Sequence, residues 1–217
     1  MPPEISQVDA YVFYFDVIGF VDDYLANGAD ALHRLRLFQR AARAEFAFGH
    51  EHSYVATIYD NVWARLNAVE PGMPSLLLNF AGDTMQAARE YGFNRFFGCI
   101  TRGVHDFDPN DRMLVGGENF EDLREQHLDV TSEPHIRAAL AEKWSRLARF
   151  PKDCIWISSE VSNLPSLSAQ CAYPNSSFEP FGPAFDLAGA ELQGGRTWPF
   201  ASSRFRAIRE RSEAGEA

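Results

Sequence analysis

The pattern of apolar and polar positions begins with a strand that is apolar on both faces. Residues 10–17 are apolar at every position except one and are rich in Val, Phe and Tyr, as expected for a central strand. Carboxylates at Asp22 and Asp23 suit the first turn of a helix, and apolar residues then recur at helical spacing from 32 to 42. We therefore predict one buried strand, followed by two helical pieces that end near Gly49.

The next segment predicts a hairpin. Residues 53–69, SYVATIYDNVWARLNAV, contain two strand-like runs on either side of Asp60-Asn61, a dipeptide suited to the tip of a tight turn. Apolar positions have helical spacing over residues 75–91, and residues 95–107 are strand-like. The order of elements to this point is strand, two helices, two strands, helix and strand.

The second half of the chain is less regular. We predict a helix over residues 133–149, which Phe150-Pro151 would stop, and a strand over DCIWIS, residues 153–158. Beyond it, Ser, Pro, Gly and aromatic residues accumulate without a period. Residues 162–217 are therefore predicted to be an irregular appendage with a disordered tail, or a terminal hairpin around RTWPFASSRFRAI packed on the same domain. The main domain would then span residues 1–161.

Composition narrows the chemistry to small anionic ligands and metal ions. The chain has 217 residues and a formal net charge of −10, so it lacks the broad basic surface that nucleic acid requires, and we exclude that partner. A polyphosphate would bind only where cations or backbone amides reverse the local field. The three cysteines have no CxxC spacing, which argues against a disulfide framework and a zinc site. Because we find no apolar run of membrane length and no leader, we expect a cytoplasmic protein without a membrane partner.

Asp16 and Asp60 are the candidate metal ligands. A carboxylate at the end of a buried strand is costly unless it is paired or bound to a metal, although Asp16 could instead cap the following helix through amides near Ile18 and Gly19. For Asp60, the alternative is turn chemistry alone. If the first strand pairs with the hairpin in one antiparallel sheet, both carboxylates reach the same edge. There they would suit Mg²⁺ or Mn²⁺ carrying a triphosphate.

The same segments resemble a known family. FYFDVIGFVDDY, residues 13–24, resembles the first metal-binding element of class III nucleotidyl cyclases, and TIYDNVWARL, residues 57–66, resembles the second. The segments FFGCITRGVHDFD, LVGGENFEDLREQ and ARFPKDCIWIS look like later elements of that family, in the same order. The resemblance covers residues 9–160.

This resemblance implies a fold, a cofactor and a reaction. The fold would be α+β, of the ferredoxin-like or palm type with the order βααββαβ, in which helices flank a central, mostly antiparallel sheet. Two divalent cations, Mn²⁺ or Mg²⁺, would be held by Asp16, Asp60 and the backbone carbonyl of Val17. The reaction would be cyclisation of a nucleoside triphosphate to its 3′,5′-cyclic monophosphate, with release of pyrophosphate.

Substrate contacts are predicted at two places. Backbone amides of Ile18, Gly19 and Phe20 lead into a helix and can receive phosphate oxygens. Purine-specific members of the family have a lysine at the position of Ala56. The resemblance therefore implies that this chain lacks the side chain that recognises adenine. Tyr54 is a candidate wall for a smaller base, and its alternative is an ordinary core residue.

Three more residues are candidates from the resemblance and from charge. Asn119 and Arg124 are the nearest match to the family's asparagine and arginine, which position ribose and stabilise the transition state across a head-to-tail homodimer. Their spacing is five where the family has four, and the alternative for Arg124 is an exposed helix residue. Arg102 could meet phosphate or base, and its alternative is a solvated strand-end arginine.

The small size of the chain and the form FDVIGF…YDN…RG look most like the stand-alone cyclases of Pycsar anti-phage systems, which make cyclic CMP or cyclic UMP. We therefore expect a uridylate cyclase with UTP as its preferred substrate. Its product would act on a cyclic-nucleotide-responsive effector in antiviral defence. The alternatives are a purine cyclase, adenylate or guanylate, with an unusual base pocket, and an inactive cyclase-like module that binds a nucleotide or a protein.

Overall fold

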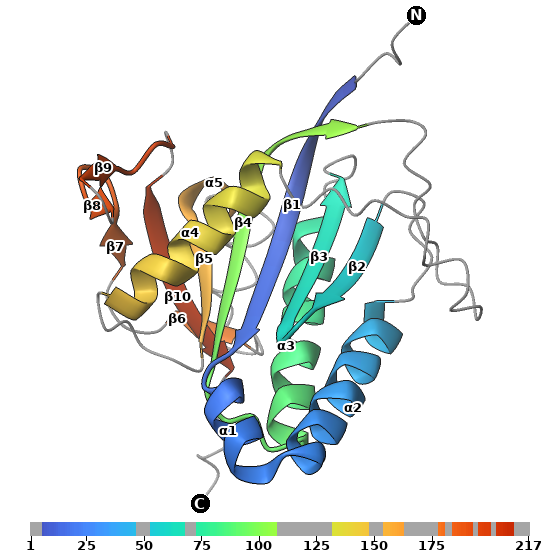
Figure 1. The fold of residues 1–217 in the computed structure, drawn as a ribbon. Helices are drawn as coiled ribbons and strands as arrows, with labels where there is room; N and C mark the ends of the chain where they lie inside the picture. The colour runs from blue at the N-terminus through green and yellow to red at the C-terminus, as the bar shows by residue number, and fades with distance from the viewer. Residues whose placement is uncertain are drawn as a thin grey trace, which may run out of the picture.

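A twisted sheet with helices on both faces organises the chain (Figure 1). This computed structural model describes residues 6–46, 53–67, 73–107, 132–147, 154–162, 178–180, 184–192, 195–200 and 203–210. Within those residues the helices are α1 (Phe20–Asn27), α2 (Ala29–Phe46), α3 (Met73–Glu90), α4 (Glu133–Leu147) and α5 (Ser159–Ser162). The strands are β1 (Ser6–Val17), β2 (Ser53–Ile58), β3 (Asn61–Asn67), β4 (Phe96–Phe107), β5 (Ile155–Ser158), β6 (Phe178–Pro180), β7 (Phe185–Asp186), β8 (Glu191–Leu192), β9 (Arg196–Thr197) and β10 (Arg204–Glu210).

The sheet is mostly antiparallel, with β1 at its centre. Its strand order is β2-β3-β1-β4-β5-β10-β6, with β7 alongside β10, and β8 pairs with β9 in a separate ribbon. Only the β4–β5 pairing is parallel among the strand pairs that the described ranges contain. The predicted α+β fold and the order βααββαβ are therefore confirmed.

Side chains of β1 alternate between the two faces, as the strand period of two requires. Phe13 and Phe15 lie in the core with α2 and α3, where Phe15 packs against Phe38 and Phe96 with ring centroids 5.7 and 5.0 Å apart. Tyr14 lies on the opposite face, in the cluster that α4 covers. Figure 1 shows α4 on the near face and α3 behind the sheet. Burying each phenylalanine is worth roughly 1.5–3 kcal/mol, so the core fixes which face the intervening residues occupy.

Helix α4 is fastened to the sheet by a buried arginine. Arg137 forms ion pairs with Glu133 and Glu160, and it donates a hydrogen bond of 2.9 Å to the backbone carbonyl of Arg102 on β4. Nearby, the Thr101 hydroxyl donates to the Pro134 carbonyl at 2.8 Å. These contacts hold the start of α4 against the middle of β4. Among the described helices, none is long and apolar enough to cross a membrane.

The C-terminal part adds short strands to the fold. Residues 196–208 do not pair with each other as a hairpin, because β9 pairs with β8 while β10 lies between β5 and β6. Strand β10 therefore extends the same sheet that contains β1, beyond the predicted boundary at residue 161. The predicted tail is RERSEAGEA, residues 209–217. Arg209 and Glu210 belong to β10, and residues 211–217 lie outside the described residues.

Asp186 joins β7 to β10, and its hydrogen bonds should make the stability of the fold depend on pH. Its carboxylate accepts hydrogen bonds from the Ser203 hydroxyl (2.5 Å), the Ala188 amide (2.8 Å) and Arg204 Nε (2.8 Å). The Ser203 hydroxyl, followed by the Ala188 amide and Arg204, lowers the pKa of Asp186 to about 2. Because this pKa is depressed on folding, the stabilisation is present above the unfolded pKa and is lost as pH falls through the folded value.

We predict that Asp186→Asn lowers the urea midpoint of unfolding at neutral pH, and that the difference from the wild type shrinks as the pH is lowered from about 4 to about 2. Urea titrations followed by circular dichroism across this range measure it. A difference of constant size at every pH would show that the carboxylate charge has no part in the effect.

Candidate functional site

The candidate site is at the C-terminal end of β1. Asp16 lies one residue before the end of the strand and is only 3% exposed. It shares its face with Tyr14, and its direct neighbours across the sheet are Asn61 on β3 and Phe97 on β4. The same alternation that buries Phe15 among the helices thus places Asp16 on the opposite face.

Asp60 is in the two-residue turn between β2 and β3. The turn consists of Tyr59 and Asp60, one residue earlier than the predicted tip, because Asn61 already pairs with Ile58 as the first residue of β3. The carbonyl of Asp60 accepts a hydrogen bond of 3.3 Å from the Val17 amide. This bond joins the turn to the end of the central strand.

Asn61 links the two carboxylates. Its Nδ2 donates to Asp60 Oδ1 at 3.2 Å, and its position directly across from Asp16 brings their β-carbons to about 5 Å. The carboxylate of Asp60 is therefore held by a side chain that occupies the Asp16 face. Asn61 Oδ1 is buried and accepts no hydrogen bond within the part of the chain that the structure describes.

These groups fit a hard divalent cation. Carboxylate, carbonyl and amide oxygens are the ligands that Mg²⁺ and Mn²⁺ prefer, and the buried oxygen of Asn61 adds an acceptor beside Asp60. In the described residues no group of three or more His, Cys, Asp or Glu side chains is arranged as a metal site. A cation here would complete its shell with the Val17 carbonyl, water or substrate oxygens, as Mg²⁺ commonly does.

The turn from β1 to α1 presents backbone amides beside these carboxylates. Gly19 has φ of 86°, a left-handed conformation that favours glycine, and it is the N-cap of α1 without a side-chain cap. Within the described chain, the amides of Phe20, Val21 and Asp22 have no backbone acceptor. They are the first-turn amides that a helix leaves available for an anion.

Ile18 does not fit its predicted role. Its amide donates a hydrogen bond of 2.9 Å to the carbonyl of Arg95, just before β4, so it is already satisfied. The Phe20 side chain is half-buried against Phe93 and is directed toward the core. Phosphate contacts in this turn would therefore come from backbone amides that begin at Gly19.

The face that contains Asp16 continues onto an aromatic group that the sequence did not single out. Trp63 is the direct neighbour of Tyr14 on one side and Ala56 on the other, with a ring-centroid distance of 4.3 Å to Tyr14. The His135 ring of α4 lies 5.4 Å from the indole. Trp63 follows Asn61 by two residues in a strand, so the strand period places both side chains on the same face. This spacing was the sequence signal that could have identified Trp63.

Two base-pocket candidates lie on β2. Ala56 is buried and faces the same side of the sheet as Trp63. Tyr54 pairs with Arg65 along the backbone, and its side chain lies outside the described parts of the structure. The register therefore places Ala56 on the face that contains Asp16.

Arg102 is not part of this site. It pairs with Tyr11, whose side chain is on the α2 and α3 face, and it lies five residues along β1 from Asp16, or roughly 16 Å. Its guanidinium forms an ion pair with Asp9 and lies 5.5 Å from the Tyr11 ring centroid. The hydrogen bond to Asp9 raises the pKa of Arg102. Asn119 and Arg124 lie outside the described residues.

Comparison with known proteins identifies the fold. No family model matches the chain, and no curated protein matches it by sequence. Solved structures do match. The dimeric guanylyl cyclase domain of the RhoGC fusion protein from the aquatic fungus Blastocladiella emersonii superposes with a TM-score of 0.59 at 14% identity, covering 97% of this chain and 99% of that one. This chain has the fold of a class III nucleotidyl cyclase domain.

Two more cyclase structures agree with this assignment. The adenylate/guanylate cyclase/hydrolase from Silicibacter pomeroyi gives a TM-score of 0.54 at 16% identity, with 96% and 100% of the two chains covered. The guanylate cyclase domain of RhGC from Catenaria anguillulae, solved in complex with GTP, gives 0.51 at 13% identity, with 95% and 100% covered. At these identities, the comparison establishes the cyclase fold and leaves the chemistry to the residues of the site.

We predict that Mn²⁺ stabilises the wild-type protein and fails to stabilise the Asp16→Asn/Asp60→Asn double variant. A cation at 100 times its dissociation constant raises the free energy of unfolding by about 2.7 kcal/mol, and calorimetry with and without Mn²⁺ measures this. Asp9→Asn is the matched control, because Asp9 is on the same strand but is paired with Arg102. Equal stabilisation of all three proteins would place the cation elsewhere.

Proposed function

We propose that this protein cyclises a pyrimidine nucleoside triphosphate, with UTP preferred, to its 3′,5′-cyclic monophosphate and pyrophosphate. The observation that supports this most directly is the junction of β1 with the β2–β3 turn. There the Val17 amide bonds to the Asp60 carbonyl, and Asn61 links the Asp60 carboxylate to the Asp16 face. The cyclase fold places this junction beside the first turn of α1.

The proposed reaction requires charge control more than covalent chemistry. Asp16 and Asp60, with the Val17 carbonyl, would hold two divalent cations, which lower the pKa of the ribose 3′-hydroxyl and neutralise the phosphates when bound. Amides of Gly19, Phe20 and Val21 would orient the phosphates at the positive end of α1. The 3′-oxygen bonds to the α-phosphorus, the bond from that phosphorus to the β-bridging oxygen breaks, and the hydroxyl proton passes to water.

The β2–β3 face supports a preference for a small base. Ala56 provides no polar side chain there, and Trp63 is packed between the rings of Tyr14 and His135, so its indole cannot easily turn aside. A fixed, bulky wall beside a small apolar residue favours a pyrimidine over a purine by steric exclusion. The resemblance to the Pycsar cyclases supports a pyrimidine substrate, UTP or CTP, and of these two we propose UTP.

The wider setting is also part of the proposal. We infer that the enzyme acts in the cytoplasm as a head-to-tail homodimer, in which Asn119 and Arg124 complete the partner's site, and that its product acts on an effector in anti-phage defence. The fungal cyclase domain, described as a non-canonical dimer, supports dimerisation in general, and the head-to-tail arrangement rests on the resemblance in sequence. The resemblance in sequence supports the defensive role.

A purine cyclase is the second candidate. The fungal structures that match this chain are guanylyl cyclase domains, and one was solved with GTP. In that case, the purine would have to be accommodated beside Trp63 without the lysine that purine-specific relatives place at the position of Ala56. Product analysis separates the two candidates.

We predict that the protein, given UTP, CTP, ATP and GTP separately with Mn²⁺, forms cyclic UMP fastest, as identified by chromatography with mass spectrometry. Asp60→Asn should reduce the rate by a factor on the order of 100 or more, because it removes a charged metal ligand. Its circular dichroism spectrum should remain that of the wild type, and Asp9→Asn should keep its activity. Undiminished turnover by Asp60→Asn would refute the two-cation assignment.

We also predict that Trp63→Ala raises GTP and ATP turnover relative to UTP turnover, on the order of tenfold, because it removes the proposed wall. The measurement is the ratio of kcat/KM values for each triphosphate. Trp144→Ala is a control, since Trp144 is a partly buried tryptophan of α4 in the same aromatic cluster. An unchanged ratio in Trp63→Ala would remove this residue from base selection.

A further inference from the structure

We propose that helix α2 sets the geometry of the site through two positioning residues, Arg34 and Gln39. Arg34 holds α1, whose first turn faces the phosphates, and Gln39 holds the turn that contains Asp60. This inference rests on the proposed function for its kinetic consequences. The contacts themselves are independent of it.

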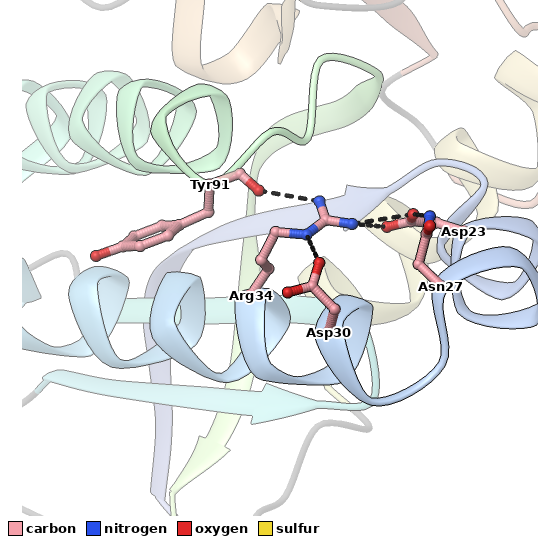
Figure 2. A network of polar contacts seen from close by, with 5 residues as sticks. All are labelled: Asp23, Asn27, Asp30, Arg34 and Tyr91. Atoms are coloured by element: carbon pink, nitrogen blue, oxygen red, sulfur yellow. Dashed lines mark hydrogen bonds and ion pairs between the residues drawn. The ribbon is translucent and has the colours of Figure 1, made fainter.

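Arg34 is the centre of a polar network (Figure 2). Its Nη2 donates to both carboxylate oxygens of Asp23 on α1, at 2.8 and 3.0 Å. Its Nε donates to Asp30 at 3.1 Å, and its Nη1 donates to the Tyr91 carbonyl at 3.2 Å. The guanidinium carbon also lies 5.4 Å from the centroid of the Phe93 ring. One side chain thus joins α1, α2 and the segment that leads into β4.

Helix α1 has little else to hold it in place. None of its residues is buried, and Val21, Tyr24 and Leu25 are exposed. Phe20 alone among its residues packs against the main core cluster, where its ring meets that of Phe93. The two-oxygen ion pair of Asp23 with Arg34 is therefore a principal attachment of α1, and both side chains are about three-quarters shielded from solvent.

Gln39 acts on the other element of the site. Its Nε2 donates a hydrogen bond to the backbone carbonyl of Tyr59. Tyr59 has φ of 55°, a left-handed conformation that is unfavourable for a non-glycine residue, and its side chain is 87% exposed. Because the exposed ring contributes little packing, the turn depends on backbone bonds. Two of these bonds run from the Gln39 side-chain amide to the Tyr59 carbonyl and from the Val17 amide to the Asp60 carbonyl.

Both residues are held by the same rigid support. On α2, Ala31, Leu35, Phe38 and Ala42 recur at helical spacing and are buried against the sheet. Arg34 and Gln39 flank this buried row and are five residues apart, about 7.5 Å along the helix axis. One packed helix therefore contacts both α1 and the turn that contains Asp60, in addition to the direct bond from the Val17 amide to the Asp60 carbonyl.

This arrangement predicts two separable defects. Loss of the Arg34 contact should loosen α1 and raise the KM for the triphosphate about three- to tenfold, at saturating Mn²⁺. Loss of the Gln39 contact should loosen the turn and raise the half-saturating concentration of Mn²⁺ by a similar factor, at saturating triphosphate. These factors correspond to the net worth of a hydrogen bond, and a general loss of stability would affect both quantities together.

The test uses variants that remove donors and keep shape. Gln39→Met and Gln39→Glu both lack the amide donor. Asp23→Asn weakens the ion pair with Arg34 from the α1 side and leaves α2 unchanged, so it replaces Arg34→Met as the test if that variant unfolds. Gln86→Met is the matched control for Gln39, because Gln86 is an exposed helix glutamine that donates to Glu90 of its own helix. The melting temperature is measured for each variant. We expect Arg34→Met and Asp23→Asn to raise the KM for the triphosphate, and the Gln39 variants to raise the half-saturating concentration of Mn²⁺. Gln86→Met should match the wild type in both quantities.

Hydrogen–deuterium exchange provides a readout that does not depend on catalysis. Arg34→Met and Asp23→Asn should speed exchange in residues 20–27 only, and Gln39→Met should speed exchange in residues 59–61 only. Wild-type exchange in both segments of all the variants would overturn the positioning role. If the wild-type protein makes no cyclic nucleotide, the proposed function fails, while the exchange pattern still decides the inference about α2.

Discussion

The alternation of side chains along β1 is the constraint on which the candidate site depends. Phe13 and Phe15 must face the helices to form the core, so Tyr14 and Asp16 must face the other way. A shift of one residue in the pairing of β1 would exchange the two sets. The hydrophobic core therefore places the buried carboxylate of Asp16 on the opposite face, where a bound cation would compensate for its burial.

The register with β3 then decides what meets that carboxylate. Since Asp16 pairs with Asn61, the turn that precedes β3 ends beside the last residues of β1. The same register aligns Tyr14 with Trp63, and β2 adds Ala56 to this row. Asp16, a proposed metal ligand, and Trp63, the proposed base wall, thus lie in successive rows on one face of the sheet. Their spacing follows from the strand repeat of about 3.3 Å per residue.

Helix α2 links the candidate site to the hydrophobic core, and none of its side chains is a proposed metal or substrate ligand. Its buried side packs on the core, and its flanking polar side chains reach α1 and the β2–β3 turn. Both loops that would contact the substrate are therefore attached to one packed helix. Loops that hold functional residues generally need such support, because they have few buried contacts of their own.

The sequence by itself determined the order of the elements, the central position of β1 and the presence of Asp60 in a tight turn, because periodicity and turn chemistry are local properties. Only the tertiary structure decided that Arg102 faces away from Asp16, that the Ile18 amide is occupied by Arg95, and that β10 pairs with β5. It also revealed Trp63 and the links from α2. These features depend on contacts between segments far apart in the chain, which the local pattern of a single sequence does not fix.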